Sequence, residues 1–318
     1  MKRFVNKVFW FAVLLASVFI ALIFFTPPDE NSYLSEYNHK LQLLSHTPGQ
    51  RIIFVGGSSV AFGNDSQTIS DSLGMPVINF GLHAGIGIKY PLTDCLSHVH
   101  KGDVVVAQIE YPNFYTGGNG EASTLALFMN ATGWRGVTML NLPQWIYVIR
   151  GIPRLAWGNL VRLVKYPFTG NINQDVPSDE FKYRRSGFNR WGDEVSHYEL
   201  PAGRLQLTGK TEDNKIDPAF MDWLDDCFRQ FEQRGAQVII LPPVCCESYF
   251  SIVNDPSIAQ AMDAIGRPFA APMKAMVLSD SCSYDYAYHV TREGVRQNSL
   301  NIIRAIKPIL NRQNSGNK

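Results

Sequence analysis

The chain has 318 residues, of which 45% are hydrophobic and 18% are charged, and its formal net charge is +1 at pH 7. This length is enough for one sizeable domain with its own core. The near-zero net charge and the lack of a basic tract argue against nucleic acid as a partner. The cysteines show no metal-ligand spacing, so we predict neither a metal site nor a cofactor. They are Cys95, Cys227, Cys245, Cys246 and Cys282.

The N-terminal segment predicts a single membrane-spanning helix. Residues 8–25 contain no charged residue and only one polar residue, Ser17. With Phe4 and Val5 the stretch approaches the ~20 apolar residues that cross a bilayer as a helix. We therefore expect residues 1–25 to form a membrane anchor.

The flanking charges predict the orientation of this anchor. Basic residues precede the apolar stretch and acidic residues follow it, namely Lys2, Arg3 and Lys7, then Asp29, Glu30 and Glu36. Positive charge stays on the cytoplasmic side, so we expect the domain on the periplasmic or extracellular side. A cleaved signal peptide would have an apolar region of only ~7–15 residues ending in small residues. Residues 24–28, FFTPP, offer no such site, which favours an uncleaved, single-pass anchor.

The rest of the chain predicts a linker followed by one α/β domain. Residues 26–50 are expected to form a polar linker, with room for a short helix, that lifts the domain off the membrane. From Arg51 onward, strands alternate with helices, which predicts a three-layer fold with a parallel sheet covered by helices on both faces. The predicted strands are 51–55, 76–80, 103–109 and 236–241, and the predicted helices are 66–73, 88–100, 218–235, 257–277 and 291–307. We assign residues 51–312 to this domain, with a largely helical insertion at about 114–216.

The insertion contains a segment without acidic residues. From Ala122 to Gln174 there is no Asp or Glu, while basic residues are interspersed with tryptophan and tyrosine. The basic residues are Arg135, Arg150, Arg154, Arg162 and Lys165. This composition suits a segment that lies at lipid headgroups or against a membrane protein. A helical insertion that packs on the domain, with its basic residues in solvent, explains the pattern equally well.

A glycine-rich turn after the first predicted strand presents two serines. Residues 51–63 read RIIFVGGSSVAFG, so an apolar strand breaks at Gly56-Gly57 and delivers Ser58 to its end. Glycine tolerates a tight turn and leaves space beside the hydroxyl of a nucleophilic serine. Ser59 competes for this role, but a serine at a loop-to-helix transition commonly caps the helix. We therefore prefer Ser58 as the nucleophile.

An acid and a histidine lie close together near the C-terminus. Residues 284–294 read YDYAYHVTREG, which places Asp285 four residues before His289. A serine hydroxyl needs a base within hydrogen-bond reach, and the base needs an orienting group. Serine early, with Asp and His late, is one of the chain orders in which such a triad is assembled. The alternative is that His289 is a surface residue at the start of the last helix.

Together these two blocks resemble the SGNH/GDSL superfamily of esterases and acyltransferases. There the nucleophile lies in a Gly-Asp-Ser-Leu block after the first strand, and a D-x-x-H block near the C-terminus completes the triad. Ser58 matches the family serine, whereas the last block of this chain has one residue more than the family spacing. The resemblance covers residues 51–110 and 236–307. It implies an SGNH/flavodoxin-like fold with a catalytic triad of Ser58, Asp285 and His289.

The resemblance also implies donors for an oxyanion hole. The candidates are the backbone of Ser58 and the loop NFGLHAGIG after the second strand, where we prefer Gly85 to Gly81. The family's Gly-x-Asn-Asp block after the third strand is absent, and Asn113 is the only amide nearby. Anchored members often lack that block too, among them the D-alanyl-transfer protein of teichoic acid modification and the alginate O-acetylation proteins.

We therefore expect a membrane-tethered serine O-acyltransferase or esterase, which moves an acyl group, in the first instance acetyl, to or from an envelope polysaccharide. By analogy with the anchored members, its partners would be the membrane, a glycan polymer or acyl donor, and a polytopic membrane acyltransferase. Two alternatives stay open. One is a membrane-surface lipase or thioesterase of the same fold, and the other is a non-catalytic scaffold that holds a glycan or a partner.

Overall fold

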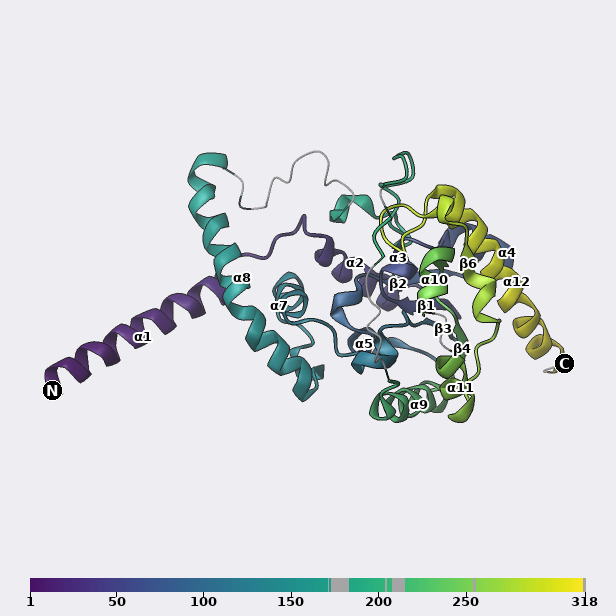
Figure 1. Ribbon diagram of the computed structural model, residues 1–318, viewed down its shortest axis with the longest axis horizontal. Helices are drawn as coiled ribbons and strands as arrows, with labels where there is room; N and C mark the ends of the chain where they lie inside the picture. The colour runs from purple at the N-terminus through teal and green to yellow at the C-terminus, as the bar shows by residue number, and fades with distance from the viewer. Residues whose placement is uncertain (171, 173–182, 204, 208–214, 254–255, 317–318) are drawn as a thin grey trace.

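A four-stranded parallel sheet forms the centre of the domain (Figure 1). The computed structural model describes residues 1–170, 172, 183–203, 205–207, 215–253 and 256–316. The strands are β1 (Ile52–Gly56), β2 (Val77–Gly81), β3 (Val104–Gln108) and β4 (Gln237–Leu241), in the spatial order β2-β1-β3-β4. Their register aligns Gly56 with Gly81 and with Gln108. The strands therefore end in one row, at the edge where ligands bind in parallel sheets.

Helices cover both faces of this sheet (Figure 1). One face carries α2 (Glu36–His46), α5 (Lys89–His98) and α9 (Pro218–Gln233), and the other carries α4 (Ser66–Leu73) and α12 (Arg292–Gly316). Successive strand residues point to opposite faces. In β1, Ile53 and Val55 accordingly join the first core, while Ile52 and Phe54 join the second. The predicted α/β fold, with a parallel sheet between two helical layers, is confirmed.

Residues 26–50 form part of the domain, so the prediction of a linker was wrong. They contain the short 3-10 helix η1 (Tyr33–Ser35) and α2, and the side chains of Tyr37, Leu41 and Leu44 are buried in the core. These positions follow the spacing of one helical face, which the polar composition of the segment obscured. Arg51, itself fully buried, pairs with Asp103 at 2.5 Å and donates to the carbonyl of Leu44. This contact holds the end of α2 against the sheet.

The chain between β4 and α12 also differs from its prediction. A single helix over 257–277 was expected, but α11 (Pro256–Ala264) ends before Gly266, which has a φ of 72°. Pro268 and Pro272 then prevent the helix from resuming. The remaining elements here are β5 (Cys245–Cys246), α10 (Glu247–Val253), η6 (Met273–Met276), β6 (Val277–Leu278) and η7 (Asp280–Cys282). Strands β5 and β6 pair in a second, parallel sheet.

The predicted insertion is helical over much of its described length. After the loop helices α3 (Ser58–Ala61), η2 (Ala84–Ile86) and α6 (Asn113–Thr116), the chain forms α7 (Ala122–Ala131), η3 (Val137–Met139), α8 (Leu142–Thr169) and η5 (Arg185–Gly187). Helix α8 begins with a capping box, in which Asn141 and Gln144 exchange side-chain and backbone hydrogen bonds. Residues 173–182 and 208–214 of the predicted insertion lie outside the described residues.

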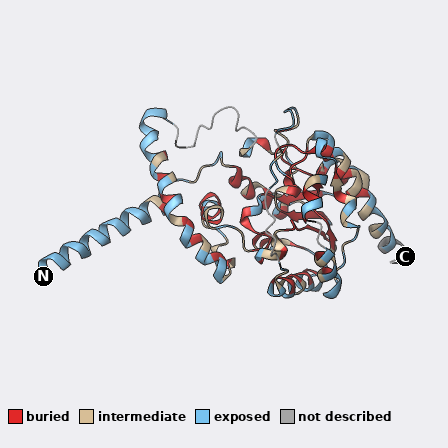
Figure 2. Cartoon of the chain, viewed as in Figure 1, coloured by how far each residue is buried: buried red, intermediate tan, exposed pale blue. Residues whose placement is uncertain are grey.

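Helix α1 (Lys2–Phe24) extends away from the domain and is exposed along most of its length (Figures 1 and 2). Its most apolar 18-residue window has a mean hydropathy of 2.4, and 6% of that window is buried. Among the described residues it is the one helix long and apolar enough to cross a membrane. A helix long and apolar enough to cross a membrane is therefore present where the sequence predicted one.

The packing of α2 gives a first prediction. Leu44→Ala removes a side chain with no exposed surface, so we expect the free energy of unfolding to fall by ~2–5 kcal/mol. Denaturant unfolding in mild detergent, followed by near-UV circular dichroism, measures this. The matched control is Gln42→Ala, at an exposed position of the same helix, which should cost less than ~0.5 kcal/mol. Equal, small effects of the two substitutions would show that α2 is not part of the folded core.

Candidate active site

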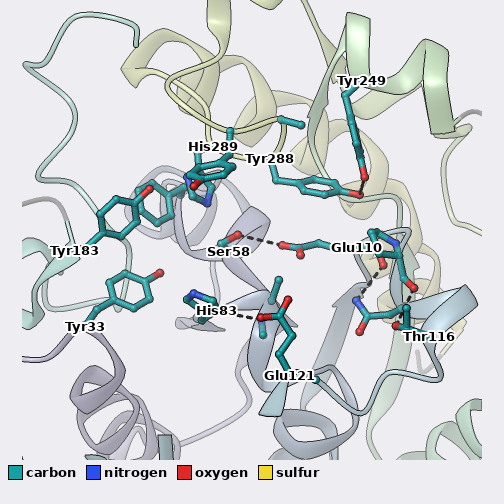
Figure 3. A pocket seen from close by; sticks show the side chains of 18 residues that line it. Tyr33, Ser58, His83, Glu110, Thr116, Glu121, Tyr183, Tyr249, Tyr288 and His289 are labelled. Atoms are coloured by element: carbon teal, nitrogen blue, oxygen red, sulfur yellow. Dashed lines mark hydrogen bonds between the residues drawn. The ribbon is translucent and has the colours of Figure 1, made fainter. Parts of the chain in front are cut away.

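A cavity of about 610 Å³ opens at the edge where the strands of the sheet end (Figure 3). Its walls come from the turn after β1, the loops after β2 and β3, residues 286–289, and the side chains of Tyr33, Tyr183 and Tyr249. Several polar side chains of different chemistry line it, including Ser58, His83, Glu110, Asn113 and His289. A concave site with a few convergent polar groups is the usual form of a ligand or active site.

The turn after β1 leaves no room for a side chain at Gly56 and brings Gly57 against the carboxyl group of Glu110. A Cβ on Gly56 would lie 2.4 Å from Val60 Cγ2 and 2.6 Å from the Gln108 carbonyl oxygen. A Cβ on Gly57 would lie 2.6 Å from Glu110 Oε1. All three distances are shorter than real Cβ contacts. At Gly56 the neighbours include backbone, so no side chain fits, whereas a side chain at Gly57 would displace the carboxyl group of Glu110. The glycine pair thus allows α3 to begin at Ser58, directly after the strand.

The two adjacent serines have different surroundings. Ser58 lines the cavity, and its Oγ donates a hydrogen bond to Glu110 Oε1 at 3.3 Å. Ser59 is 1% exposed, and among the described residues its Oγ has no hydrogen-bond partner. Its backbone N–H donates to the same Glu110 oxygen at 2.8 Å. Ser59 lies within α3 rather than at its N-cap, which is Gly57, so the capping role expected for it is not seen.

The acid and histidine of the last block form a hydrogen-bonded pair. His289 Nδ1 lies 2.8 Å from Asp285 Oδ1, and Tyr183 donates its hydroxyl to Asp285 Oδ2 at 2.8 Å. The His289 ring stacks on Phe62 with centroids 4.0 Å apart and planes 9° from parallel. A turn accommodates the extra residue between acid and histidine, because the His289 N–H donates to the Tyr286 carbonyl at 3.0 Å.

Ser58 and His289 line the same cavity without a direct hydrogen bond between them among the described contacts. Figure 3 shows the Ser58 hydroxyl turned toward Glu110, with the His289 ring above it. Because His289 Nδ1 is engaged by Asp285, Nε2 is the ring nitrogen left for a substrate or nucleophile.

Glu110 is the main site residue that the sequence reasoning missed. Burial raises the pKa of its carboxyl group, and the hydrogen bond from the Ser59 N–H and the nearby His289 partly offset this rise. The expected parallel pairing of the first and third strands could have located Glu110 beside Ser58. Gly56 pairs with Gln108, so Ser58 and Glu110 each follow their strand by two residues and meet beside one another. Tyr183 could not have been found in this way, because it comes from the insertion.

A second histidine, His83, lies in the cavity as a neutral side chain. Burial, together with the nearby His289, lowers the pKa of His83 to about 4. Its Nδ1 accepts the backbone N–H of Gly85 at 2.9 Å. A further histidine, His197, is buried with both ring nitrogens engaged, by Glu194 at 2.6 Å and by the Val290 carbonyl at 2.8 Å. His197 is thus held as part of the packing.

Three of the predicted oxyanion donors, in Gly81, Gly85 and Asn113, are already engaged in hydrogen bonds. Gly85 lines the cavity, but its N–H points to His83. The N–H of Gly81 donates to Asn79 Oδ1 at 3.0 Å, and a Cβ there would lie 2.4 Å from Val60, so this glycine serves close packing against α3. Asn113 lines the cavity and donates its Nδ2 to the Glu110 carbonyl at 3.0 Å.

No family model matches the chain, and no curated protein or solved structure matches it either. Among the described residues, no group of three His, Cys, Asp or Glu side chains could hold a metal ion. The interpretation of the site therefore depends on its own geometry. A hydroxyl group, an imidazole with an acidic partner and a buried carboxyl group converge in one cavity, which is a set of groups able to perform nucleophilic and acid–base chemistry.

The raised pKa of Glu110 predicts a pH-dependent stability. In the unfolded chain this carboxyl ionises at its ordinary pKa of 4.5, whereas burial favours the protonated form in the folded state. Its contribution to stability is therefore full below the unfolded pKa and is lost as the pH rises through the folded pKa. Glu110→Gln keeps an acceptor for the Ser59 N–H and abolishes this titration. The variant should be more stable than the parent at pH 8, with the difference disappearing toward pH 4.

Denaturant unfolding at pH 4, 6 and 8 measures this difference. The matched control is Glu247→Gln, at an exposed position of α10, for which we expect no pH-dependent change. A stability difference between Glu110→Gln and the parent that is the same at every pH would contradict the assignment, since it would mean that folding does not change the pKa of this carboxyl group.

Proposed function

We propose that this protein is a membrane-tethered serine O-acyltransferase or esterase of the SGNH type, with Ser58 as its nucleophile. One observation carries the proposal: a serine on a strand-to-helix turn shares a cavity with a histidine whose other ring nitrogen is hydrogen-bonded to an aspartate. This is the set of roles by which a serine triad is recognised, whatever its order along the chain. The resemblance of the two sequence blocks to the SGNH superfamily supports the same reading.

The reaction we propose follows from these positions. Ser58 Oγ attacks the carbonyl carbon of an ester while His289 Nε2 takes the hydroxyl proton. Asp285 holds the protonated imidazole through Nδ1, and Tyr183 orients Asp285 from its other side. The ester oxygen leaves as an alcohol with the proton from His289, and an acyl group remains on Ser58. Water or a sugar hydroxyl then takes this acyl group after losing its own proton to His289, which restores the free serine.

The oxyanion of each tetrahedral intermediate needs hydrogen-bond donors. The backbone N–H of Ser58 is suited to this, because the first turn of a helix leaves its N–H groups without intrahelical partners. Gly85 and Asn113 stay candidates that would exchange their present partners for the oxyanion. When Glu110 is protonated, its carboxyl group is a further hydrogen-bond donor beside Ser58. In the SGNH superfamily an asparagine amide after the third strand would take this role.

The cavity walls support a sugar-containing substrate. Five tyrosines line the cavity, namely Tyr33, Tyr183, Tyr249, Tyr286 and Tyr288. Their rings offer aromatic faces on which a sugar ring can stack, while the hydroxyl groups of Tyr33 and Tyr183 are engaged by the Leu82 carbonyl and by Asp285. We propose acetyl transfer to or from an envelope polysaccharide, with a polytopic membrane acyltransferase supplying the acyl group. A preference for long over short acyl chains in p-nitrophenyl esters would instead indicate a lipase or thioesterase.

We also propose that α1 stays attached and that the domain faces the periplasm or the exterior. The charge difference across α1 supports this orientation. The end of α1 is also bound to the domain, since the Leu22 carbonyl accepts a hydrogen bond from Asn159 Nδ2 at 2.8 Å. A mature N-terminus near residue 27 in the purified protein would contradict an uncleaved anchor.

Substitution of the triad tests the proposed reaction. Ser58→Ala and His289→Ala should each lower the hydrolysis rate of p-nitrophenyl acetate by about 10⁴-fold or more, and the double variant should be little worse than either. Asp285→Asn should leave the circular dichroism spectrum unchanged and cost up to ~10⁴-fold, because it favours the wrong imidazole tautomer.

Ser59→Ala is the matched control for Ser58→Ala. It changes the neighbouring serine, whose Oγ does not line the cavity, so hydrolysis and labelling by a fluorophosphonate should persist. Labelling that persists in Ser58→Ala and disappears in Ser59→Ala would show that the wrong serine is assigned. A folded protein that neither reacts with the probe nor hydrolyses short esters would favour the non-catalytic scaffold.

A further inference from the structure

Helix α8 is exposed along much of its length (Figure 2), and among the described residues beyond 25 most of the exposed large apolar side chains lie on it. Beyond residue 25, fifteen large hydrophobic side chains of the described residues are exposed, and ten of them lie on α8. They are Leu142, Trp145, Ile146, Ile149, Trp157, Leu160, Leu163, Val164, Tyr166 and Phe168. An apolar surface of this extent marks a site of association with another molecule or a membrane.

Eight of these side chains form a stripe along α8. Leu142, Trp145, Ile146 and Ile149 make up its first part, and Trp157, Leu160, Leu163 and Val164 its second. The two parts are eight residues apart, which at 3.6 residues per turn is about two turns, so both lie on one face of the helix. The opposite face is buried on the domain through Val148 and Leu155. Arg150 and Arg154 follow the stripe along one of its edges and are exposed. Helix α8 thus has one face packed on the domain, an exposed apolar face, and a basic edge beside the apolar face.

The basic residues of the segment 122–174 are not balanced by any acidic residue within it. From Ala122 to Gln174 the chain has neither Asp nor Glu. Arg150, Arg154 and Lys165 are exposed, as the sequence predicted for a segment at a headgroup surface. Arg162 differs from that prediction, because it is buried and donates hydrogen bonds to the Asn159 side chain and to the Ile172 and Pro27 carbonyls.

The contacts of Asn159 and Arg162 fix α8 against the end of the membrane-spanning helix. Asn159 Nδ2 binds the Leu22 carbonyl at 2.8 Å, and Arg162 binds the Pro27 carbonyl at 2.9 Å. The ring of Phe24 lies 5.0 Å from that of Trp134, which comes from the loop between α7 and α8. Figure 1 shows α8 running across the C-terminal end of α1. Where α1 leaves the bilayer, α8 is therefore already at its surface.

We propose that α8 lies in the plane of the bilayer that α1 spans, with its apolar stripe among the acyl chains and its basic edge at anionic headgroups. A helix with a charged edge and Trp or Leu on its apolar face is the usual form of such an interfacial segment. The lipid surface is preferred to a protein partner because α1 alone brings the stripe to the membrane. This proposal does not depend on the catalytic role of Ser58.

Site-directed spin labelling of the full chain in anionic phospholipid nanodiscs tests the proposal. The native cysteines are all buried, so an added surface cysteine can be labelled selectively. Labels at Ile149→Cys and Trp157→Cys should be severalfold more accessible to oxygen, relative to a water-soluble nickel chelate, than a label at Arg304→Cys on α12. Arg304 is exposed on the far side of the sheet and serves as the matched control. A label at Arg154→Cys should give an intermediate ratio.

Two results would overturn the proposal. Labels at Ile149 and Trp157 that are as accessible to the nickel chelate as the Arg304 label would show that the stripe faces water. Labels shielded from both reagents would show that protein covers it, either a second copy of the chain or another partner. Leu142→Cys, at the exposed start of α8, provides a third position should one of the variants fail to fold.

Discussion

The candidate site depends on the close approach of the Gly57 backbone to the carboxyl group of Glu110. A Cβ on Gly57 would lie 2.6 Å from Glu110 Oε1, and this same oxygen accepts the Ser59 N–H at 2.8 Å. The approach is possible because β1 and β3 are neighbours in register, with Gly56 opposite Gln108. It fixes the start of α3 at the edge of the sheet. Ser58 is consequently left facing the cavity, while Ser59 is turned into the protein.

The loop that carries Asp285 and His289 is held in place by contacts with residues of the insertion. Tyr183 reaches Asp285, and the backbone N–H groups of Gly203 and Gln206 donate to the carbonyls of Tyr284 and Asp285. The Glu194 N–H donates to the Ala61 carbonyl of α3 at 2.9 Å. The insertion is therefore a wall of the site that joins the serine turn to the acid–histidine loop, and its helix α8 joins the same domain to the end of α1.

Much of this arrangement was predictable from the sequence, because its signals are local. Strand β1, the glycine turn and helix α4 follow short-range patterns of apolar residues, glycines and caps. The pairing of Asp285 with His289 follows from their four-residue spacing in one loop. The class of fold follows from the alternation of strands and helices.

The features that were mispredicted depend on contacts between distant segments. The burial of α2 depends on a core that its polar composition did not reveal, and the hydrogen bond of Tyr183 to Asp285 joins residues 102 positions apart. Glu110 was missed because its partners are two serines 51 and 52 positions away, on the turn after the neighbouring strand. Arg162 was expected in solvent or at lipid, yet it binds the carbonyl of Pro27, 135 positions away. Patterns along the chain do not encode such pairs.

The central claim is that Ser58 Oγ carries an acyl group during the reaction. The most direct measurement is to mix the full chain with p-nitrophenyl acetate, stop the reaction in acid and locate the acetyl group by peptide mass spectrometry. The account predicts an initial burst of p-nitrophenol and an acetyl group on Ser58, both lost in His289→Ala. Hydrolysis without any acetyl group on Ser58, or acetylation confined to Ser59 or to surface lysines, would contradict it.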